Sequence, residues 1–469
     1  MLTTLDKARQ INVDTKRYGT FAEIGAGQEV VRWFFRAGGA AGTVAKSISA
    51  YDMEVSDAIY GDCDRYVSRE RLDAMLIHEQ ALNRERLADQ RGSDHSFFTF
   101  ADTVSARNYL GTNECHAWMG MRFQARPGAE DSVIIVHARM LDDTNPAQQE
   151  ALGIVGVNLI HAAHTWSDNV YKLVESLVEN LGRDRIEIDM IDVSGAAFED
   201  IDNRVLSLYL VQLGLTGAAM FSASGKMLQP SAVLRKRPLL VQRGRFRPIT
   251  HVNVDMMRAA RDQFEPHCAP SENGLLPIME ISMHNLTDTD TVCLEDFVSR
   301  AEVIASTGSV VMVSDFQEYH RLAAYLTRYT DRQIGLCMGL AALQGLFDES
   351  YYRDLDGGLL ESVGRLFKKQ IKLLIYPYKS TNTGQVQCLR NVGFDDARQH
   401  LIDFLTARRS LISLENICYD YLDIHSPAVL DMIERGDNNW SALVPKSVEM
   451  IIRSKRLFGY QSSSRSATV

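Results

Sequence analysis

The sequence lacks the features that mark a secreted, membrane-spanning or disulfide-linked protein. Its seven cysteines never form a C-x-x-C pair, and their odd number does not suggest a disulfide framework, so we expect reduced thiols. The start, MLTTLDKARQINVDTKRYG, has no apolar h-region. The uncharged stretch 151–167 includes Asn158, His161 and His164 and is short for a membrane span, so it predicts a buried helix. These absences predict a cytoplasmic protein.

Positive charge is also scarce. The chain has 50 lysines and arginines against 60 acidic residues, a net charge of -10 and a pI near 5.7. This balance argues against coating nucleic acid or anionic lipid, and we expect neither a nucleic acid polymer nor a membrane as partner. A hydrophobic content of 45% and a charged content of 23% are typical of globular proteins, and 469 residues suffice for two or three domains.

The glycines of a phosphate-binding P-loop are missing from GGAAGTVAKS, because Ala40 and Ala45 stand where that motif needs glycine. The preceding QEVVRWFFRAGG is helix-like, so the small residues are interpreted as allowing close helix packing. In the following KSISAYDMEVSDAIYG, helical spacing would place Lys46, Met53 and Asp57 on one face. Lys46 with Asp57 is therefore a candidate catalytic centre, with a desolvated amine as base or Schiff-base former. The alternative is a structural ion pair.

Hydrophobic periodicity predicts helices first and an alternation of strands and helices afterwards. Residues 20–92 are expected to be helical, with Ser68 as the N-cap of the last helix and Gly92 as its end. Three β-like runs follow, at 97–101, 116–124 and 132–140. Further helices and strands then alternate to the end of the chain, which is typical of an α/β protein.

The expected fold class is therefore α/β, with mostly parallel sheets covered by helices, in two Rossmann-like halves after a helical N-terminal region. The turn-rich stretch 266–277 (PHCAPSENGLLP) is the best linker candidate. The expected domains are a helical region at 1–95, an α/β domain at 96–269, a second α/β domain at 270–460 and a flexible tail at 461–469. Sites are expected in loops at the carboxyl ends of the strands.

A polar face is predicted on the strand ECHAWMGMRFQ. Strand alternation places His116, Trp118 and Arg122 on one face, and His137 and Arg139 extend that face if the run 132–140 pairs alongside. Two imidazoles and two guanidiniums suit an anionic ligand, with His116 and His137 as candidates for acid–base catalysis.

Two other histidine arrangements are weaker candidates for catalysis or metal binding. Cys115 and His116 are poor partners as nucleophile and base, because neighbours on a strand point apart. His161 and His164 have the spacing of a metal-binding pair, but no acidic third ligand is implied. We interpret them as core residues and expect no metal site.

The segment RIEIDMIDVSGAAFEDIDNR supplies acidic candidates at a strand end. Asp189, Asp202 and Arg204 lie where an α/β sheet can bind a ribose hydroxyl or a metal. The alternative is that Asp200 or Asp202 caps the next helix.

The segment LRKRPLLVQRGRFRPITH concentrates six positive charges in an acidic protein. Arg243, Arg245 and Arg247 are the preferred anion-binding residues, because guanidiniums bind phosphate or carboxylate in a bidentate manner. An edge strand protected by charge is the alternative.

Two further motifs could bind an anion. Upstream of the basic segment, the residues 222–226 (SASGK) form either a phosphate cradle or a hairpin turn. Downstream, Gly357-Gly358 precedes a helix and is interpreted either as an anion-binding helix start or as a simple turn.

Six segments resemble a bacterial protein family over almost the whole chain. They are AAGTVAKSISAYDMEVSDAIYG, RYVSRERL, ECHAWMGMRFQ, QEALGIVGVNLI, RGRFRPITHV and DGGLLESVGRLF. Members of that family carry transferred labels, commonly "TonB-dependent receptor" or "nicotinate-nucleotide adenylyltransferase", and the resemblance implies no mechanism and no site residues.

Neither label fits the motifs of this chain. A TonB-dependent receptor needs a signal peptide and many alternating segments of about ten residues. Adenylyltransferases of the second kind use an H-x-G-H-like motif after their first strand, whereas this chain has H-A-A-H at 161–164 on an expected helix.

The leading hypothesis is a soluble cytoplasmic enzyme, expected to be a homo-oligomer, that binds a small anionic, phosphorylated or nucleotide-like substrate. The residues name neither the reaction nor a cofactor. The first alternative is a non-enzymatic self-assembling scaffold, and nucleotidyl transfer of the nicotinate-nucleotide adenylyltransferase kind is a lesser one.

Overall fold

A computed structural model describes residues 2–286, 292–380 and 383–461, and the chain divides into two compact units, Met1–Thr216 and Gly217–Val469. This division differs from the predicted boundary near residue 270. Strand β9 (Leu239–Arg243) pairs with β10 (Leu276–Ser282) in one sheet, so the predicted linker is a connection inside the second unit. Most of the predicted tail lies outside the described residues.

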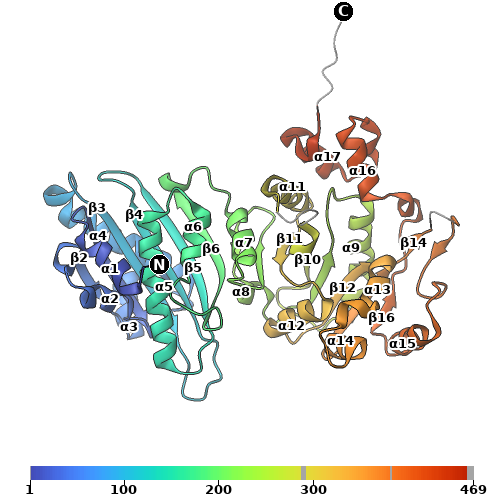
Figure 1. Cartoon of the computed structure of the whole chain (residues 1–469), viewed down its shortest axis with the longest axis horizontal. Helices are drawn as coiled ribbons and strands as arrows, with labels where there is room; N and C mark the ends of the chain where they lie inside the picture. The colour runs from blue at the N-terminus through green and yellow to red at the C-terminus, as the bar shows by residue number, and fades with distance from the viewer. Residues whose placement is uncertain (1, 287–291, 381–382, 462–469) are drawn as a thin grey trace, which may run out of the picture. The chain divides into compact units, whose positions relative to one another are not determined.

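The first unit is built on a six-stranded mixed sheet (Figure 1). Strand β1 is parallel to β2 and β3, and the pairs from β3 to β6 are antiparallel. In spatial order the strands are β2 (Val44–Ile48), β1 (Arg17–Gly25), β3 (Ser96–Ser105), β4 (His116–Gln124), β5 (Asp131–Met140) and β6 (Ile186–Gly195).

Two of these strands lie in the region that was predicted to be helical. Strand β1 is buried along most of its length, and short apolar runs of this kind have the same pattern in a buried helix and in a buried strand. Strand β2 follows a 3-10 turn, η1 (Ala40–Gly42), so the small residues of GGAAGTVAKS form a turn and a strand rather than a helix contact. The predicted helix after Ser68 is confirmed as α4 (Arg69–Arg91), with the Ser68 hydroxyl accepting from the Arg71 amide.

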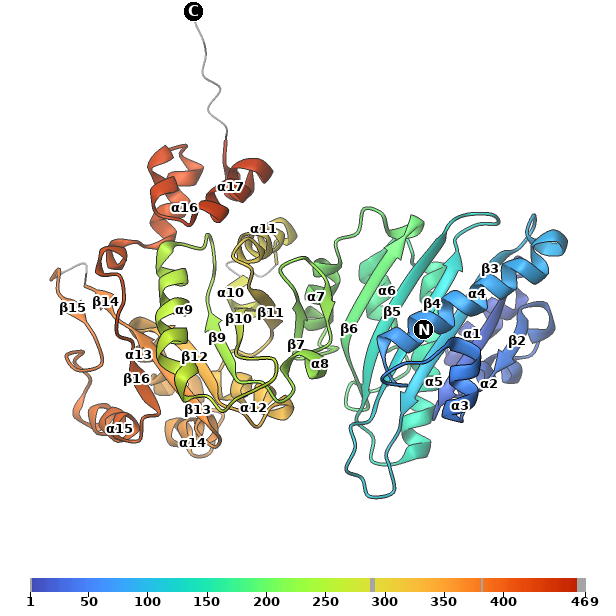
Figure 2. The same cartoon turned by 180° about the vertical axis from the view of Figure 1, so that it is seen from behind.

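Helices cover both faces of this sheet (Figure 2). One face carries α4, whose Asn83 and Gln80 bond to Thr99 of β3. The opposite face carries the aromatic core of Phe21, Phe98 and neighbouring apolar residues. The helices that bury residues in this core are α1 (Thr4–Val13), α2 (Val30–Ala37), α5 (Asn145–Thr165), α6 (Val170–Ser176) and α7 (Asn203–Gln212).

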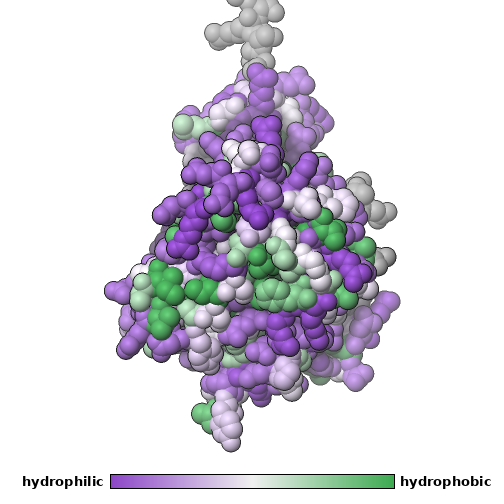
Figure 3. All heavy atoms as spheres, turned by 90° about the vertical axis from the view of Figure 1, so that its left-hand side faces the viewer, coloured by the Kyte–Doolittle hydropathy of each residue, from purple (hydrophilic) through white to green (hydrophobic). Residues whose placement is uncertain are grey.

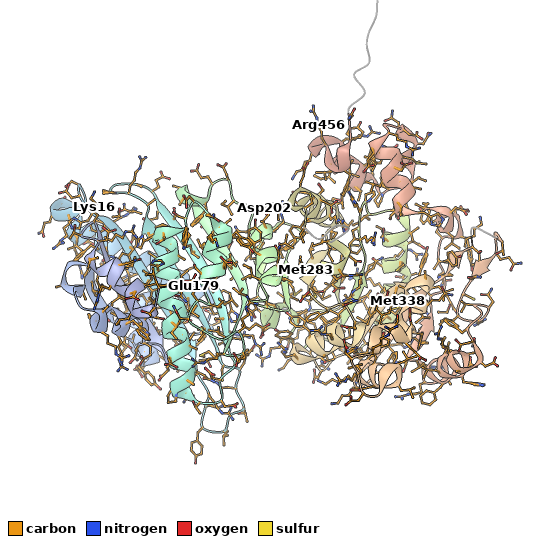
Figure 4. All side chains as sticks on the ribbon, in the orientation of Figure 1. Lys16, Glu179, Asp202, Met283, Met338 and Arg456 are labelled. Atoms are coloured by element: carbon orange, nitrogen blue, oxygen red, sulfur yellow. The ribbon has the colours of Figure 1, made fainter. Side chains whose placement is uncertain are left out.

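Helix α5 confirms the predicted buried helix at 151–167. Its one central amide, Asn158, accepts from the Lys7 ammonium at 2.7 Å and donates to two backbone carbonyls. Lys7 is itself buried and lies 2.5 Å from the carboxylate of Glu179, which is labelled in Figure 4. No helix among the described residues combines the length and the apolar content that crossing a bilayer requires.

The second unit has a doubly wound sheet. Its six parallel strands, numbered along the chain, lie in the order 3-2-1-4-5-6 from one edge to the other, which is the order of dinucleotide-binding folds. From that edge they are β11 (Val310–Ser314), β10, β9, β12 (Ile334–Gly339), β13 (Ile371–Tyr376) and β16 (Leu411–Ser413). Beyond β11, the antiparallel strands β7 (Ala218–Phe221) and β8 (Met227–Leu228) extend the sheet, and β14 (Tyr378–Lys379) and β15 (Val386–Gln387) form a separate ladder.

Successive side chains of β9 enter two different cores. Leu240 packs with α9 (His251–Phe264), whereas Leu239 and Val241 pack with helices on the other face. Those helices are α12 (Tyr319–Tyr329), α13 (Leu340–Leu346), α14 (Gly358–Leu366) and α15 (Asp396–Ala407). The remaining α-helices of this unit are α8 (Pro230–Leu234), α10 (Met283–Leu286), α11 (Leu294–Ala305), α16 (Ser426–Glu434) and α17 (Lys446–Lys455). The predicted α/β class, with helices covering the sheets, is confirmed; the second sheet is mostly parallel, whereas the first is mixed and antiparallel from β3 to β6.

Candidate functional site

Two imidazoles and a carboxylate form a hydrogen-bonded chain across three antiparallel strands of the first unit. His116 Nδ1 lies 3.0 Å from His137 Nε2, and His137 Nδ1 lies 2.5 Å from Asp189 Oδ1. His116 begins β4 and His137 lies on β5, diagonally opposite on the same face. Asp189 lies at a register shift between β5 and β6. The β-bulge at this shift brings its carboxylate beside His137.

The proton positions follow from the chemistry of the three groups. An ionised Asp189 can only accept, so His137 donates through Nδ1. A neutral His137 then accepts at Nε2, and His116 must donate through its own Nδ1. His116 Nε2 is left as an unprotonated nitrogen, and no group in the described parts of the chain hydrogen-bonds to it.

The surroundings of these three residues keep His116 neutral and hold it in position. His137 and Asp189 are fully buried, while His116 is only half-buried. Burial, and next the neighbouring His137, lowers the pKa of His116 to about 4. The Trp118 ring packs 4.8 Å from the His137 ring, measured between centroids. The arrangement can take a proton at His116 while the buried carboxylate stabilises the cation that forms.

Arg139 flanks this chain but is engaged by acidic neighbours. Its Nη1 lies 2.5 Å from the Glu187 carboxylate, and its Nε lies 3.7 Å from Glu114. Glu187 also accepts from the Thr216 hydroxyl at 2.8 Å. The positive charge of Arg139 is largely compensated by the carboxylates of Glu187 and Glu114. Arg139 therefore serves to orient the strand ends beside His116.

The basic segment of the second unit lies at the point where the sheet reverses its order. Arg243 ends β9, and residues 244–250 connect this central strand to α9. Strands β10 and β12 flank β9 on its two sides, so this loop leaves the sheet at the topological switch point. Ligands of doubly wound folds bind in the crevice at this position.

The three arginines of this loop have different surroundings. Arg243 is bidentate to the buried Glu280 at 2.6 and 2.8 Å, and its guanidinium packs 4.6 Å from the Tyr319 ring. Arg247 pairs with Asp296 at 2.8 Å. Arg245 is exposed. Arg243 and Arg247 therefore hold the loop in place, and Arg245 is the most exposed of the three.

Lys46 and Asp57 do not form a common centre. Lys46 is on β2 and bonds to the buried Glu79, which also accepts from Tyr60 at 2.9 Å. Asp57 is on α3 (Met53–Tyr60) and pairs with Arg71 at 2.6 Å. The predicted shared helix face does not exist because Lys46 belongs to a strand, and each charge has a structural partner of its own.

Three other predicted binding residues also have structural roles. Arg122 bonds to Asp131 at 2.8 Å, which also pairs with Arg84. Asp202, labelled in Figure 4 at the start of α7, caps that helix and is bidentate to Arg204. The predicted alternative that Asp202 caps a helix therefore matches the structure, because its carboxylate already bonds to the helix start and to Arg204.

The segment 222–226 and the two histidines of α5 occupy ordinary structural positions. The segment 222–226 is a hairpin turn between the antiparallel strands β7 and β8, closed by the Ser222 amide bonding to the Lys226 carbonyl. His161 and His164 lie on α5, where His164 packs against Phe98 with ring centroids 5.5 Å apart.

The sequence interpretation missed a buried carboxyl pair, Glu23 and Asp102. The two residues are register partners on the parallel strands β1 and β3. Glu23 accepts from the amides of Gln28, Val30 and Val31 at the start of α2. Both Asp102 oxygens are buried without a hydrogen-bond partner among the described residues. The visible signal was the acidic residue before Gly-Ala-Gly in EIGAG, which marks a strand-to-helix turn.

We expect this carboxyl pair to make the first unit less stable at higher pH. Burial raises the pKa of Glu23 to about 6 and raises the pKa of Asp102 well above its ordinary value. Because folded-state pKa values are raised, the stabilisation is complete below the unfolded pKa and is lost as the pH rises through 6. For Glu23 alone the loss between pH 4 and pH 8 is about 2 kcal/mol. Asp102→Asn is expected to remove the part of this dependence that Asp102 contributes and to leave the part that Glu23 contributes through its burial.

The measurement is urea unfolding at several pH values for the wild type and for Asp102→Asn. The exposed Asp143→Asn serves as a control with the same change in charge. An unchanged pH dependence in Asp102→Asn would show that Asp102 does not contribute to it.

No protein-family model matches the chain, and no curated protein matches it in sequence. Solved structures of competence or damage-inducible proteins are similar to about a third of it. The competence/damage inducible protein CihA of Agrobacterium tumefaciens is 15% identical, with a TM-score of 0.27, over 34% of this chain and 94% of its own. A CinA superfamily protein of Klebsiella pneumoniae is 11% identical, with a TM-score of 0.27, over 34% and 96%. At these scores the similarity assigns no residue a role.

Proposed function

We propose that this chain is an enzyme whose first unit transfers a proton through His116. The observation that supports the proposal is the chain Asp189–His137–His116, in which a fully buried carboxylate and imidazole position a half-buried imidazole. The unprotonated Nε2 of His116 is the end of this hydrogen-bonded chain that can exchange a proton with a substrate. His116 is the catalytic residue of the proposal, and His137 and Asp189 are positioning residues.

The proposed substrate class is a small anion of phosphorylated or nucleotide-like character. Support comes from the 3-2-1-4-5-6 strand order, because the three-arginine loop leaves the sheet at its switch point, the position at which doubly wound folds bind ligands. The setting proposed for this activity is the cytoplasm, as the composition predicts. Nucleotidyl transfer is the lesser alternative, because H-A-A-H lies within a buried helix and does not follow a strand.

The test of the function is depletion of a metabolite from a small-molecule cell extract, followed by mass spectrometry. We expect the wild type to consume at least one anionic metabolite. His116→Gln is expected to do so about 10²- to 10⁴-fold more slowly, the usual contribution of a general acid or base. The control is His267→Gln, an exposed histidine of the second unit. Equal rates in wild type and His116→Gln would reject the proposed function.

Arg245 is expected to provide binding energy for the anion at the switch-point loop. Replacing it with serine should weaken binding of pyrophosphate by about ten- to a hundredfold, since a charge-assisted hydrogen bond is worth roughly 1.5–3 kcal/mol. The matched control is Arg435→Ser, an exposed arginine on the same unit. Isothermal titration calorimetry measures both. Affinity that is insensitive to Arg245 would place the anion elsewhere.

The scaffold alternative has one observation in its favour. Tyr51, Met53 and Val55 are exposed by 78%, 58% and 49% around the start of α3. The face drawn in Figure 3 also shows apolar side chains among hydrophilic ones. Light scattering tests this alternative: a large defined assembly that dissociates in Met53→Ser/Val55→Ser would support it, and a monomeric protein would reject it.

A further inference from the structure

A cavity of about 570 Å³ lies along α12 in the second unit, between this helix, the 3-10 turn η4 (Glu349–Tyr352) and α14. Small side chains on α12, those of Ala323, Ala324 and Thr327, leave room between the two helices. The volume is in the range of pockets that hold small metabolites. The cavity was not among the sites predicted from sequence, although Gly357-Gly358 at the start of α14 was considered there as an anion-binding helix start.

The lining of this cavity is rich in cations. It contains Arg321, Arg365, Lys368 and Lys369, against the carboxylates of Glu318 and Asp354. Arg321 is 3.7 Å from Glu318, and Arg365 is paired at 2.6 Å with Glu361. The two lysines have no carboxylate partner among the described residues. Lys369 donates to the Thr327 carbonyl at 2.9 Å, a bond that leaves its charge uncompensated.

Aromatic and apolar groups complete the lining. Tyr351 is 51% exposed, whereas Tyr352 is buried and donates to the Leu346 carbonyl at 2.7 Å. His320 is 93% buried, with Nδ1 fixed at 3.1 Å from the Ser362 hydroxyl. A planar ring can therefore pack against Tyr351 while an anionic group reaches the lysines.

From this combination we infer that the cavity between α12 and α14 is a second binding site, for a small ligand that joins a planar ring to a phosphate group. It is distinct from the switch-point loop, because the cavity is lined by the helices of one face and contains none of the loop arginines. The lysines neutralise the phosphate, and the ring fills the space beside Tyr351. Neither half of the ligand is expected to bind well alone.

The experiment is titration calorimetry of the full chain with ADP, pyrophosphate and adenosine as probes. We expect ADP to bind more tightly than either fragment. Lys368→Ala/Lys369→Ala should weaken ADP binding by about tenfold or more, the effect of losing charge-assisted contacts. Ala324→Trp, at an exposed position on the lining, should abolish it by filling the cavity. Circular dichroism verifies that each variant is folded.

The control Lys379→Ala/Lys446→Ala removes two lysines of the same unit that do not line the cavity and should leave the affinity unchanged. Three results would overturn the inference. These are no binding of ADP to the wild type, equal affinity in wild type and Ala324→Trp, and binding that is lost in Arg245→Ser but kept in the double lysine variant. The last result would assign ADP to the switch-point loop alone.

Discussion

Asp189→Asn is expected to slow the His116-dependent reaction by about 10³-fold while leaving the first unit folded. The same replacement in a Ser-His-Asp triad costs about 10⁴ in kcat, and here the carboxylate acts through one more imidazole, which reduces its effect. Asparagine keeps the size of Asp189 and can still bond to His137, so packing is preserved. What it removes is the buried negative charge that stabilises the protonated imidazoles.

The pH profile of the reaction distinguishes this role of Asp189 from a purely structural one, which would leave the profile unchanged. The Asp189 charge raises the pKa of His116 against the larger effects of burial and of His137. In Asp189→Asn the pH profile of the reaction should therefore shift to lower pH on its acidic side. Asp184→Asn, a replacement on a turn before β6, is the control. A wild-type rate and profile in Asp189→Asn would show that the carboxylate does not tune His116.

The second large effect is expected in the other unit, where Arg243→Met should destabilise the protein by about 3–5 kcal/mol. Glu280 is fully buried, accepts both bonds from Arg243 and also accepts from the Ser314 hydroxyl. Removing the guanidinium leaves this carboxylate without its counter-charge inside the sheet. Burial of an unpaired charge is among the most destabilising single changes in proteins.

The double variant Arg243→Met/Glu280→Met is expected to recover most of the lost stability, because it removes the uncompensated charge together with its partner. Urea unfolding of the two variants and the wild type measures the difference. Arg435→Met, which removes an exposed arginine, should change stability by no more than about 0.5 kcal/mol. A similar small change in Arg243→Met would show that the pair is not a structural element of the loop.

Much of the fold could be predicted because its patterns are local. Helix α4 has a serine cap and a regular polar face, and β4 has alternating residues, so both could be identified in the sequence. The parallel strands of the second unit are short apolar runs between helices, which is the pattern of a doubly wound sheet. By contrast, β1 and β2 lack a pattern that separates a buried strand from a helix, and only their pairing with β3 defines them.

The candidate site could be predicted only in part, because its contacts join distant segments. Strand alternation placed His116 and His137 on one face, but the third member, Asp189, depends on a register shift between β5 and β6 that has no local signal. The charged candidate residues proved to be paired with other residues. Lys46, Asp57, Arg122 and Arg243 looked available in the sequence because their partners, such as Glu79 and Glu280, lie 33 and 37 residues away along the chain.

The direction of hydrogen bonding through Asp189, His137 and His116 is the basis of the proposed chemistry, and nitrogen NMR of histidine-labelled protein at neutral pH measures it directly. The expected spectrum has protons on Nδ1 of both imidazoles, a bare Nε2 on His116, and no titration of His116 until the pH approaches about 4. A proton on His116 Nε2 with a bare Nδ1, or titration of His116 near the ordinary histidine value of about 6.5, would contradict it.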